Sequence, residues 1–407
     1  MPQDQPSQDQ PSDVSEALER LLQRVDPVEP EEVPLDASQL AGRMLAEPIC
    51  LDRDSPACDV SAMDGYAVRL RELEAGPLPL TGECRMGEPP AELAAGEAFR
   101  IYTGSPLPNG ADTVVRLERA NDSDGKLILK ADANVPLGAD IRRQGENARR
   151  GEPALEAGIG LSPAAITALA TIGPSKVLVY RRLRVAVLTT GNELVPATDP
   201  SDPPPWKLRD SNGPSLTAML SPAPWIESVH HTHAEDELEP MAAQLKSLVE
   251  SHDAVVLTGG VSKGAYDYVP EAVERAGGET VFHRLNARPG RPTLGATASG
   301  KPIIGLPGNP LAVLTAGRRV LAPALRRRAG LAAVQPPSPV VSLTEWSGKP
   351  IPITWWRPVR LLQHGVAELV SLRGSGDTCG PAMSHGFVEI APGSDSLGPH
   401  PFYPWSL

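Results

Sequence analysis

The chain has 407 residues, which is too long for one typical hydrophobic core and suggests two to four domains. Its hydrophobic content of 41% and charged content of 22% are ordinary for a globular protein. The formal net charge of −12 argues against a nucleic-acid-binding protein, because such proteins hold phosphates through clustered cations. No segment approaches ~18 consecutive apolar residues, so no membrane span is predicted.

The first residues, MPQDQPSQDQPSD, predict a disordered tail over 1–12 because they are polar, acidic and rich in proline. They have neither the basic start nor the apolar centre of a signal peptide. The cysteines form no CxxC pair, which disfavours a structural zinc site and a disulfide framework. Together these features predict a cytoplasmic protein.

Short helices and a β-rich segment are predicted in the first part of the chain. The spacing of apolar residues predicts helices at 13–25, 36–45 and 161–173. Between the last two, short strand patterns broken by glycine and proline are typical of a β-rich module. We therefore expect a discontinuous helical linker domain at 13–50 and 148–180, and a β-rich module at 51–147.

An α/β domain is predicted at 181–330, because strand and helix patterns alternate there as in βαβ units. The predicted strands are 184–189, 227–233, 254–258, 280–285 and 302–306. The predicted helices are 212–220, 236–250, 268–277 and 310–328. We expect a mostly parallel sheet with helices on both faces, in three layers. A small C-terminal β domain follows at 331–407.

Four glycine-rich loops, each after a short apolar run, are the strongest functional signal. They read VAVLTTGNEL, AVVLTGGVSKGAYDY, RLNARPGRP and PIIGLPGNP. In open α/β sheets, ligands bind in the crevice beyond the carboxyl ends of the strands. Loops that carry arginines and carboxylates at this edge predict an anion site combined with a metal site.

Two of these loops carry carboxylates, Glu193 and Asp267, which suit Mg²⁺ because that ion takes one or two carboxylates together with water and phosphate. Either acid alone is more simply explained as a helix cap or a solvated loop residue. Asp210, Ser211 and Asn212 form a polar cluster just before a predicted helix. Capping is part of their explanation, because these are the preferred cap residues.

The anion-binding groups come from two further features. Gly259 and Gly260 would let backbone N–H groups approach a phosphate. Arg284, Arg288 and Arg291 surround a proline–glycine turn. Isolated arginines are usually surface ion-pair partners, but arginines in a rigid loop at the mouth of a parallel sheet favour oxyanion binding.

Other small-residue loops lie outside the α/β domain. SAMDGYA places Asp64 before a glycine, which by itself is a hairpin signal. IYTGSPLP carries Thr103, IRRQGEN carries Arg142 and Arg143, and GSGDTCG carries Ser375. The chain has no GxSxG nucleophile elbow and no complete phosphate-binding P-loop.

Taken in order, these motifs resemble the molybdopterin molybdotransferase family, the MoeA proteins of bacteria and the E domain of gephyrin. The resemblance covers almost all of the chain after the tail and implies a MogA-like central domain. It implies that molybdate is inserted into adenylylated molybdopterin with Mg²⁺-dependent release of AMP. It also implies an elongated homodimer whose site combines the α/β domain of one subunit with the β-rich module of the other. Further partners would be a MogA-like adenylyltransferase and molybdoenzyme apoproteins.

The resemblance assigns roles residue by residue. The catalytic set is Asp64, Thr103, Glu193, Asp210 and Asp267. Glu193 and Asp267 are the metal ligands. The substrate-binding set is Arg142, Arg143, Ser211, Asn212, Gly259, Gly260, Arg284, Arg288, Arg291, Pro307, Asn309 and Ser375.

Several positions depart from the family pattern. All three bases around the proline–glycine turn are arginine where lysines are common, and Asn147 ends an RRxGED-like motif. Ala234-Glu235-Asp236 replaces an RDD-like triplet. These departures leave open a non-catalytic paralogue that binds molybdopterin or the cofactor as a carrier or scaffold. Retention of Asp64, Glu193 and Asp267 favours the enzyme, because a binder does not need the metal acids.

Overall fold

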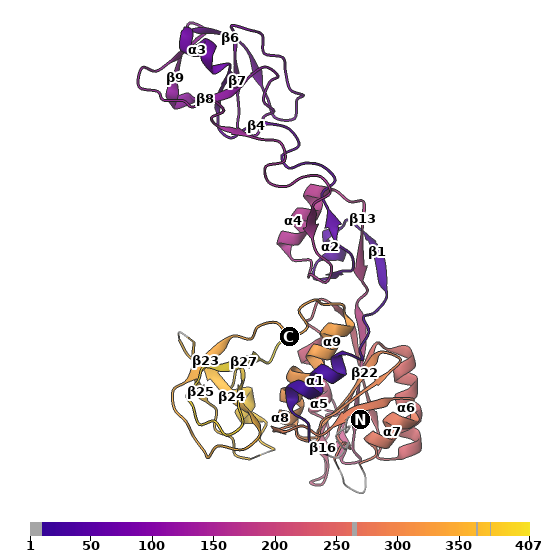
Figure 1. The fold of residues 1–407 in the computed structure, drawn as a ribbon. Helices are drawn as coiled ribbons and strands as arrows, with labels where there is room; N and C mark the ends of the chain where they lie inside the picture. The colour runs from indigo at the N-terminus through magenta and orange to yellow at the C-terminus, as the bar shows by residue number, and fades with distance from the viewer. Residues whose placement is uncertain (1–9, 263–266, 364, 375) are drawn as a thin grey trace, which may run out of the picture. The chain divides into compact units, whose positions relative to one another are not determined.

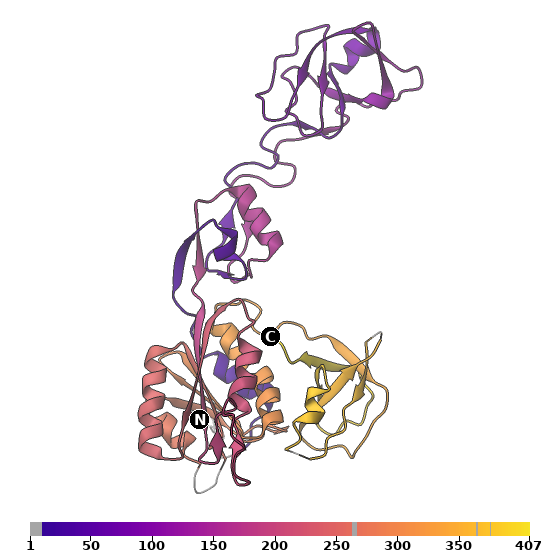
Figure 2. The same cartoon turned by 180° about the vertical axis from the view of Figure 1, so that it is seen from behind.

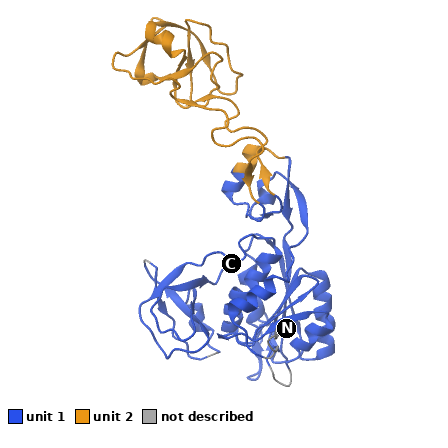
Figure 3. Cartoon of the chain, viewed as in Figure 1, with its two compact units in different colours: residues 1–47, 157–167, 175–407 blue, residues 48–156, 168–174 orange. Residues whose placement is uncertain are grey.

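The computed structural model describes residues 10–262, 267–363, 365–374 and 376–407. Most of the predicted tail and Ser375 lie outside this described part of the chain, as do residues 263–266 of the GGVSKGAYDY loop. The chain divides into two compact units, distinguished by colour in Figure 3. Unit 1 comprises 1–47, 157–167 and 175–407, and unit 2 comprises 48–156 and 168–174.

Unit 1 is built around a six-stranded sheet that carries the four glycine-rich loops. Its strand order is β17 (Ile226–Ala234), β14 (Leu183–Thr190), β18 (Ala254–Thr258), β22 (Lys301–Leu306), β21 (Leu294–Ala298) and β19 (Glu279–His283). The strands β17, β14, β18 and β22 pair in parallel, and β21 runs antiparallel to both of its neighbours. The predicted mostly parallel sheet is confirmed. Strand β21 was not predicted, because its sequence LGATA is rich in small residues that strands usually lack.

Helices cover both faces of this sheet, as Figures 1 and 2 show. Alternate residues of β14 point to opposite faces: Val185 and Val187 enter one apolar cluster, and Ala186 and Leu188 enter the other. One cluster includes α6 (Leu238–Ser251) and α7 (Val269–Arg275). The other includes α1 (Val14–Leu22), α5 (Asn212–Leu220), α8 (Pro310–Ala316) and α9 (Ala322–Arg328). The three-layer arrangement is therefore confirmed.

The first helix, α1, packs against this α/β domain. Asp13 caps it by accepting hydrogen bonds from the N–H groups of Ser15 and Glu16 at 2.9 and 3.3 Å. Its buried face, which includes Leu21, joins the core cluster of α9 and the sheet. We grouped this helix with the linker domain, but its apolar stripe is buried against the α/β domain instead. Ser12, which we placed in the tail, forms a β-bridge with Leu285.

The linker region contains a three-stranded antiparallel sheet of β1 (Pro30–Pro34), β13 (Lys176–Tyr180) and β2 (Met44–Leu45). The predicted helix at 36–45 is only α2 (Ala37–Leu40). It is shorter because the chain turns at Gly42, with φ +73°, and the next residues pair with β13. Helix α4 (Pro163–Ile172) begins as predicted, because the Ser162 hydroxyl accepts a hydrogen bond from the N–H of Ala165 at 3.3 Å.

Unit 2 contains the predicted β-rich module. Its main sheet has the order β8 (Thr113–Arg116), β5 (Gly65–Val68), β7 (Ala98–Ile101), β6 (Leu78–Cys84), β10 (Lys126–Leu129) and β9 (Ala120–Ser123). Two short ribbons flank it, β4 (Val60–Ser61) with β11 (Ile141–Arg142) and β3 (Ile49–Cys50) with β12 (Pro153–Leu155). The ribbon β4–β11 matters for function because it joins two of the sequence motifs.

The C-terminal region of unit 1 is a closed β-barrel. Its strands are β23 (Val340–Leu343), β24 (Thr354–Leu361), β25 (Val366–Leu369), β26 (Gly386–Ile390) and β27 (His400–Pro404). The ring closes because β24 pairs with both β25 and β26. The short strand β20 (Ala287–Arg288) of the ARPGRP loop also pairs with β24, so this loop is fastened to the barrel. None of the described helices has the length and apolar character needed to cross a membrane.

Candidate active site

Five of the predicted site residues line one pocket of about 280 Å³: Glu193, Gly259, Gly260, Asp267 and Pro307. The loops that supply them follow β14, β18 and β22, three neighbouring parallel strands. The carboxyl ends of parallel strands meet at one edge of the sheet, which is why residues so far apart in the sequence come together. The pocket is therefore the crevice that the glycine-rich loops predicted.

Glu193 is held over this pocket by the conformation of the loop after β14. Gly191 has φ +138°, and a Cβ atom added there would lie 2.5 Å from the Glu193 Oε2 atom. Glycine suits this position because its φ lies in a region that other residues rarely adopt, and because it leaves room for the Glu193 carboxylate above the loop. The carbonyl of Glu193 accepts a hydrogen bond from the N–H of Leu208 at 2.8 Å, which ties the loop to the segment before α5.

Asp236 also lines the pocket, although we did not predict it as a site residue. Its carboxylate accepts a hydrogen bond from the N–H of Asn192 at 3.0 Å, and its own N–H donates to the Asn192 side-chain oxygen at 3.1 Å. This reciprocal pair joins the loop after β14 to the segment after β17. The sequence signal was the departure Ala234-Glu235-Asp236, which we noted only as a missing arginine motif.

The acids of this pocket suit a hydrated metal ion better than an all-protein metal site. Within the described residues, no three His, Cys, Asp or Glu side chains lie close enough to hold an ion unaided. Mg²⁺ usually keeps several waters and binds through one or two carboxylates plus substrate phosphate. Glu193 and Asp267 meet that requirement, because both line the pocket and it leaves room for other ligands.

The glycine pair after β18 brings two loops together. Gly259 and Gly260 have φ +88° and +61°, and a Cβ atom on Gly259 would lie 2.8 Å from the Thr190 hydroxyl oxygen. The N–H of Gly259 donates to the carbonyl of Leu306 at 3.0 Å. This N–H is therefore engaged within the sheet and does not face a phosphate as we expected. At Gly259, glycine is needed so that the chain can pass Thr190.

Asp210 caps a helix and does not line this pocket. It is 5% exposed, and its Oδ1 atom accepts hydrogen bonds from the N–H groups of Asn212 and Gly213, each at 3.0 Å. Its Oδ2 atom accepts from the Thr189 hydroxyl at 2.8 Å and lies 3.0 Å from His231 Nε2. Asp210 thus fixes the start of α5 to the end of β14.

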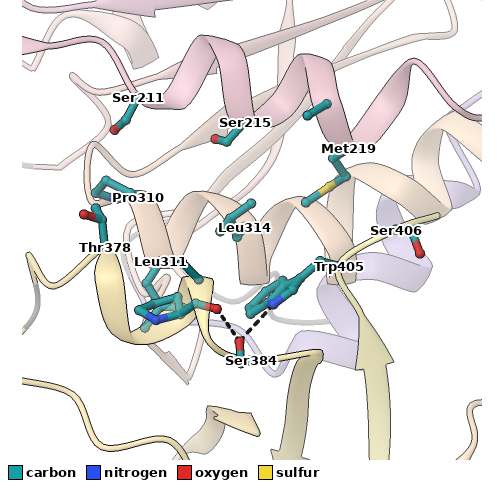
Figure 4. Close-up of a pocket in the computed structure, with 13 residues that line it drawn as sticks. Ser211, Ser215, Met219, Pro310, Leu311, Leu314, Thr378, Ser384, Trp405 and Ser406 are labelled. Carbon is teal, nitrogen blue, oxygen red and sulfur yellow. Dashed lines mark hydrogen bonds between the residues drawn. The ribbon is translucent and has the colours of Figure 1, made fainter. Parts of the chain in front are cut away.

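The two residues after Asp210 have different surroundings. Asn212 donates from its side-chain nitrogen to the carbonyl of Gly308 at 2.9 Å, which joins α5 to the LPGNP loop. Ser211 instead lines a largely apolar pocket of about 420 Å³ between α5, α8 and the C-terminal region, shown in Figure 4. There Met219, Leu314 and Trp405 face the hollow. Ser211 therefore lies apart from the acids.

A larger hollow of about 840 Å³ lies between the ARPGRP loop and the C-terminal barrel. Arg288 and Arg357 both line it, and Pro292 and Pro307 are in its walls as well as in those of the acidic pocket. The Arg357 guanidinium lies 4.5 Å from the ring centroid of Trp355, so it is held against an aromatic face. The last domain thus supplies a cation to the same hollow as Arg288.

The other predicted residues of the RLNARPGRP and LPGNP loops make hydrogen bonds that hold these loops in place. Asn309 lines the larger hollow and caps α8 by accepting a hydrogen bond from the N–H of Ala312 at 3.2 Å. Arg284 has φ +78° and donates its N–H to the carbonyl of Thr293 at 2.8 Å. The carbonyl of Arg291 accepts a hydrogen bond from the N–H of Leu285 at 2.7 Å. Within the described residues, neither of these two arginines lines the two hollows, so Arg288 is the one of the three that the structure places there.

Unit 2 brings together Asp64 and Thr103, as the motifs predicted. The Asp64 carboxylate accepts hydrogen bonds from the N–H and the hydroxyl of Thr103, both at 2.8 Å. Those two bonds, with the nearby charge of Arg100, lower the pKa of Asp64 below its ordinary value. Asp64 is therefore an anion at neutral pH, on an exposed surface of the module.

The arginines of the IRRQGEN loop are engaged by neighbouring acids. Arg142 donates to Glu146 and to Asn147, each at 2.6 Å, and Arg143 donates to Asp59 at 2.6 Å. The hydrogen bond from Arg142, followed by that from the N–H of Arg143, lowers the pKa of Glu146. Asn147 thus takes a place beside Arg142 as a neutral acceptor. The pairing of β4 with β11 places this loop next to the SAMDGYA segment.

Comparison with known proteins gives concordant matches. A family model described as the MoeA N-terminal region (domain I and II) matches residues 12–173, and one described as a probable molybdopterin binding domain matches residues 186–327. The chain is 32% identical over 355 residues to a molybdopterin molybdenumtransferase of Staphylococcus epidermidis, covering 84% of this chain and 82% of the relative. It is 34% identical over 324 residues to a protein of the same name from Synechococcus elongatus, covering 76% and 79%. The structure of the molybdopterin biosynthesis MoeA protein from Pyrococcus horikosii is 29% identical, with a TM-score of 0.78, over 98% of this chain and 100% of that chain.

Proposed function

The chain belongs to the MoeA family, and we propose that it acts in molybdenum cofactor biosynthesis as a molybdopterin molybdenumtransferase. The proposed reaction inserts molybdate into adenylylated molybdopterin and releases AMP. The observation that carries this proposal is the convergence of Glu193, Asp267 and the glycine pair on one pocket at the ends of three parallel strands. Four of the motifs that suggested the family, TTGNEL, LTGGVSKGAYDY, ARPGRP and GLPGNP, supply residues to this pocket.

We propose that the acids of this pocket would hold a Mg²⁺ ion. When bound, the ion would offset the negative charge of the phosphate oxygens. Glu193 and Asp267 would supply its carboxylate ligands, and Asp236 positions the Glu193 loop through Asn192. The departure at 234–236 is therefore compatible with an active enzyme.

The adjoining hollow is the proposed place for the rest of the substrate and for molybdate. Arg288 and Arg357 offer planar guanidinium groups that suit tetrahedral oxyanions and phosphates. The half-buried Trp355 provides an apolar part of the wall for a flat ring system. Because Pro292 and Pro307 belong to both hollows, one substrate can span them.

We further propose that the enzyme is a cytoplasmic homodimer. All four cysteines are free, which agrees with a reducing compartment. Asp64 with Thr103 would complement the acidic pocket of another copy, and a MogA-like adenylyltransferase would supply the substrate. Molybdoenzyme apoproteins would receive the product.

The test is incubation of the purified protein with adenylylated molybdopterin, molybdate and Mg²⁺, with AMP release and active cofactor as the readouts. Glu193→Gln should abolish AMP release, because it removes a metal ligand while preserving shape. Glu250→Gln, which changes an exposed acid on α6, is the matched control. Tight substrate binding by the wild type without AMP release would instead support the non-catalytic scaffold.

The dimer has its own test. Asp64→Ala and Asp267→Ala subunits should each be inactive alone, because each lacks one half of the site. Unfolding and refolding them together should restore AMP release, since a mixed dimer contains one intact site. If the mixture stays inactive while wild type treated in the same way recovers, the shared site is excluded.

A further inference from the structure

A separate hollow of about 400 Å³ in unit 1 is lined by three arginines, and the proposed transferase site does not use it. Arg318 and Arg319 come from the π-helical turn η2 (Gly317–Leu321), and Arg326 comes from α9. The opposite wall consists of the proline-rich segment 335–339 and of residues 401–404 of β27. Within the described residues, no lining residue of this hollow lines either the acidic pocket or the larger hollow beside Arg288.

One of the three arginines is neutralised within the protein. Arg319 donates to both carboxylate oxygens of Glu389 at 2.6 and 3.2 Å, and Glu389 also accepts from the indole N–H of Trp356 at 2.8 Å. The Arg319 guanidinium lies 4.9 Å from the ring centroid of Tyr403. This arginine is therefore a fixed link between the α/β domain and the barrel.

The other two arginines have no such partner. Arg318 donates to the carbonyl of Pro404 at 3.1 Å, and no carboxylate among the described residues pairs with it. The guanidinium of Arg326 has no hydrogen-bond partner in the described part of the chain. Two half-buried cations therefore share one hollow without a counter-ion.

The electrostatics of the pair agree with this geometry. Burial, followed by repulsion from Arg326, lowers the pKa of Arg318 to about 10. Burial also lowers the pKa of Arg326. Both side chains remain cationic at neutral pH, so the hollow holds two uncompensated positive charges. A bound anion would pair with both guanidinium groups and reduce the repulsion between them.

We propose that this hollow binds a phosphate group, as inorganic phosphate or as a phosphate monoester. A phosphate monoester carries a charge of about −1.5 to −2 at pH 7, which matches two unpaired guanidinium groups. Arginine forks match the geometry of phosphate oxygens, and the Tyr403 ring, 5.8 Å from the Arg318 guanidinium, gives the site an apolar floor. π-Helical turns such as η2 are also frequent at functional sites.

Isothermal titration calorimetry with inorganic phosphate at low ionic strength tests this site. The double variant Arg318→Gln/Arg326→Gln should weaken phosphate binding about tenfold or more, because each change removes charge-assisted hydrogen bonds. Arg360→Gln is the control, because Arg360 forms an exposed pair with Glu368 elsewhere on the barrel. Wild-type affinity and stoichiometry in the double variant would overturn the proposal.

A second variant keeps the test valid if the double variant does not fold. Ser338 lies in the wall of the hollow, so Ser338→Glu should supply an internal carboxylate to the two arginines. We expect Ser338→Glu to raise the Tm in phosphate-free buffer and to remove the increase in Tm that phosphate causes in the wild type. A phosphate-induced increase equal to that of the wild type would contradict the proposed site.

The two sources of phosphate are separated by a competition experiment. Phenyl phosphate should bind more tightly than inorganic phosphate if the natural ligand is a monoester whose organic part lies on Tyr403 and the prolines. Equal affinities would identify free phosphate as the ligand. If the Arg318→Gln/Arg326→Gln variant binds both probes as the wild type does, the proposal fails.

Discussion

The arginine loops at 141–147 and at 284–292 carry the same sequence signal and have different structures. Both place arginines beside a glycine, and the resemblance puts arginines of both among the substrate-binding residues. In the first loop, Arg142 and Arg143 donate to Glu146, Asn147 and Asp59. In the second, Arg288 lines the large hollow, and no carboxylate pairs with it within the described residues.

The difference shows that neighbouring acids decide whether an arginine stabilises its own loop or is available to bind an anion. A guanidinium that already has acidic neighbours crosslinks its loop, and an incoming anion must compete with them. A guanidinium that lines a hollow and has no acidic neighbour remains available to an anionic ligand. The same criterion separates Arg319, which Glu389 neutralises, from Arg318 and Arg326 in the third arginine cluster.

The largest effect is expected where an arginine is paired with a buried acid. Asp253 has a side chain that is 2% exposed; it accepts from both Arg181 Nη groups at 2.7 and 2.5 Å and from the N–H of Arg184 at 2.8 Å. Asp253→Ala should lower the free energy of unfolding by ~2–4 kcal/mol, because it removes the buried acceptor of the hydrogen bonds from Arg181 and from the N–H of Arg184. Urea denaturation measures this loss. Asp202→Ala, which removes a fully exposed partner of Arg209, should change it by less than ~0.5 kcal/mol.

The same pair gives a pH dependence. Burial of Asp253 acts to raise its pKa, but the hydrogen bonds from Arg181 and Arg184 outweigh it, so the net pKa is lowered. The stabilisation is therefore complete above the pKa of an unfolded aspartate and is lost as the pH falls through the lowered pKa. Acid titration of unfolding should show this loss in the wild type and not in Asp253→Ala. Parallel curves would exclude Asp253 as its source.

Arg288 tests the arginines that line a hollow without an acidic partner. Arg288→Gln should lower kcat/KM about 100-fold, because it removes a charged donor to the substrate oxyanion, and should leave the Tm close to that of the wild type. Steady-state AMP release and thermal unfolding measure the two quantities. Arg360→Gln should change neither. A destabilised Arg288→Gln protein would show that Arg288 stabilises the fold instead of binding substrate.

A smaller effect is expected in the loop at 141–147. Arg142 is 44% exposed on its side chain, and its ion pair with Glu146 lies at the surface. Arg142→Gln should therefore lower the free energy of unfolding of this module by less than ~1 kcal/mol. Chemical denaturation gives the value. A much larger loss would show that this loop depends on the pair more than its exposure suggests.

The smallest effect concerns Asp64. Thr103→Val removes the hydroxyl but keeps the backbone N–H, so the pKa of Asp64 should rise part of the way to its ordinary value. The Asp64–Thr103 contact stabilises the folded module at neutral pH and stops doing so as the pH falls through the lowered pKa. NMR titration of the side-chain carboxyl carbon measures the change. An unchanged pKa would show that the backbone N–H alone sets it.

Much of the α/β domain was predictable because its signals are local. The strand at 254–258 and the helix at 212–220 have the predicted bounds, since a continuous apolar run and a cluster of cap residues define them. Strand β21 and the early end of α2 were not predictable, because neighbouring strands and a turn at Gly42 decide them. Such effects come from tertiary context and not from propensity.

The candidate site was predictable to a similar degree. The common position of Glu193 and Asp267 followed from loops after parallel strands, because those strands end at one edge. The capping role of Asp210 followed from its residue type. The contribution of Asp236 and the presence of Arg357 in the same hollow as Arg288 did not follow, because each depends on segments far apart in the chain that come together in the fold.

By itself, the sequence determined the family, the α/β layers and the residues that carry charge near the ends of the strands. These properties depend on short segments, in which apolar runs, glycines and capping residues act locally. The tertiary structure alone decided which arginine meets an acid and which faces a hollow. Arg143 is neutralised by Asp59, which lies 84 residues earlier in the chain, whereas within the described residues no acid pairs with Arg288 or Arg326.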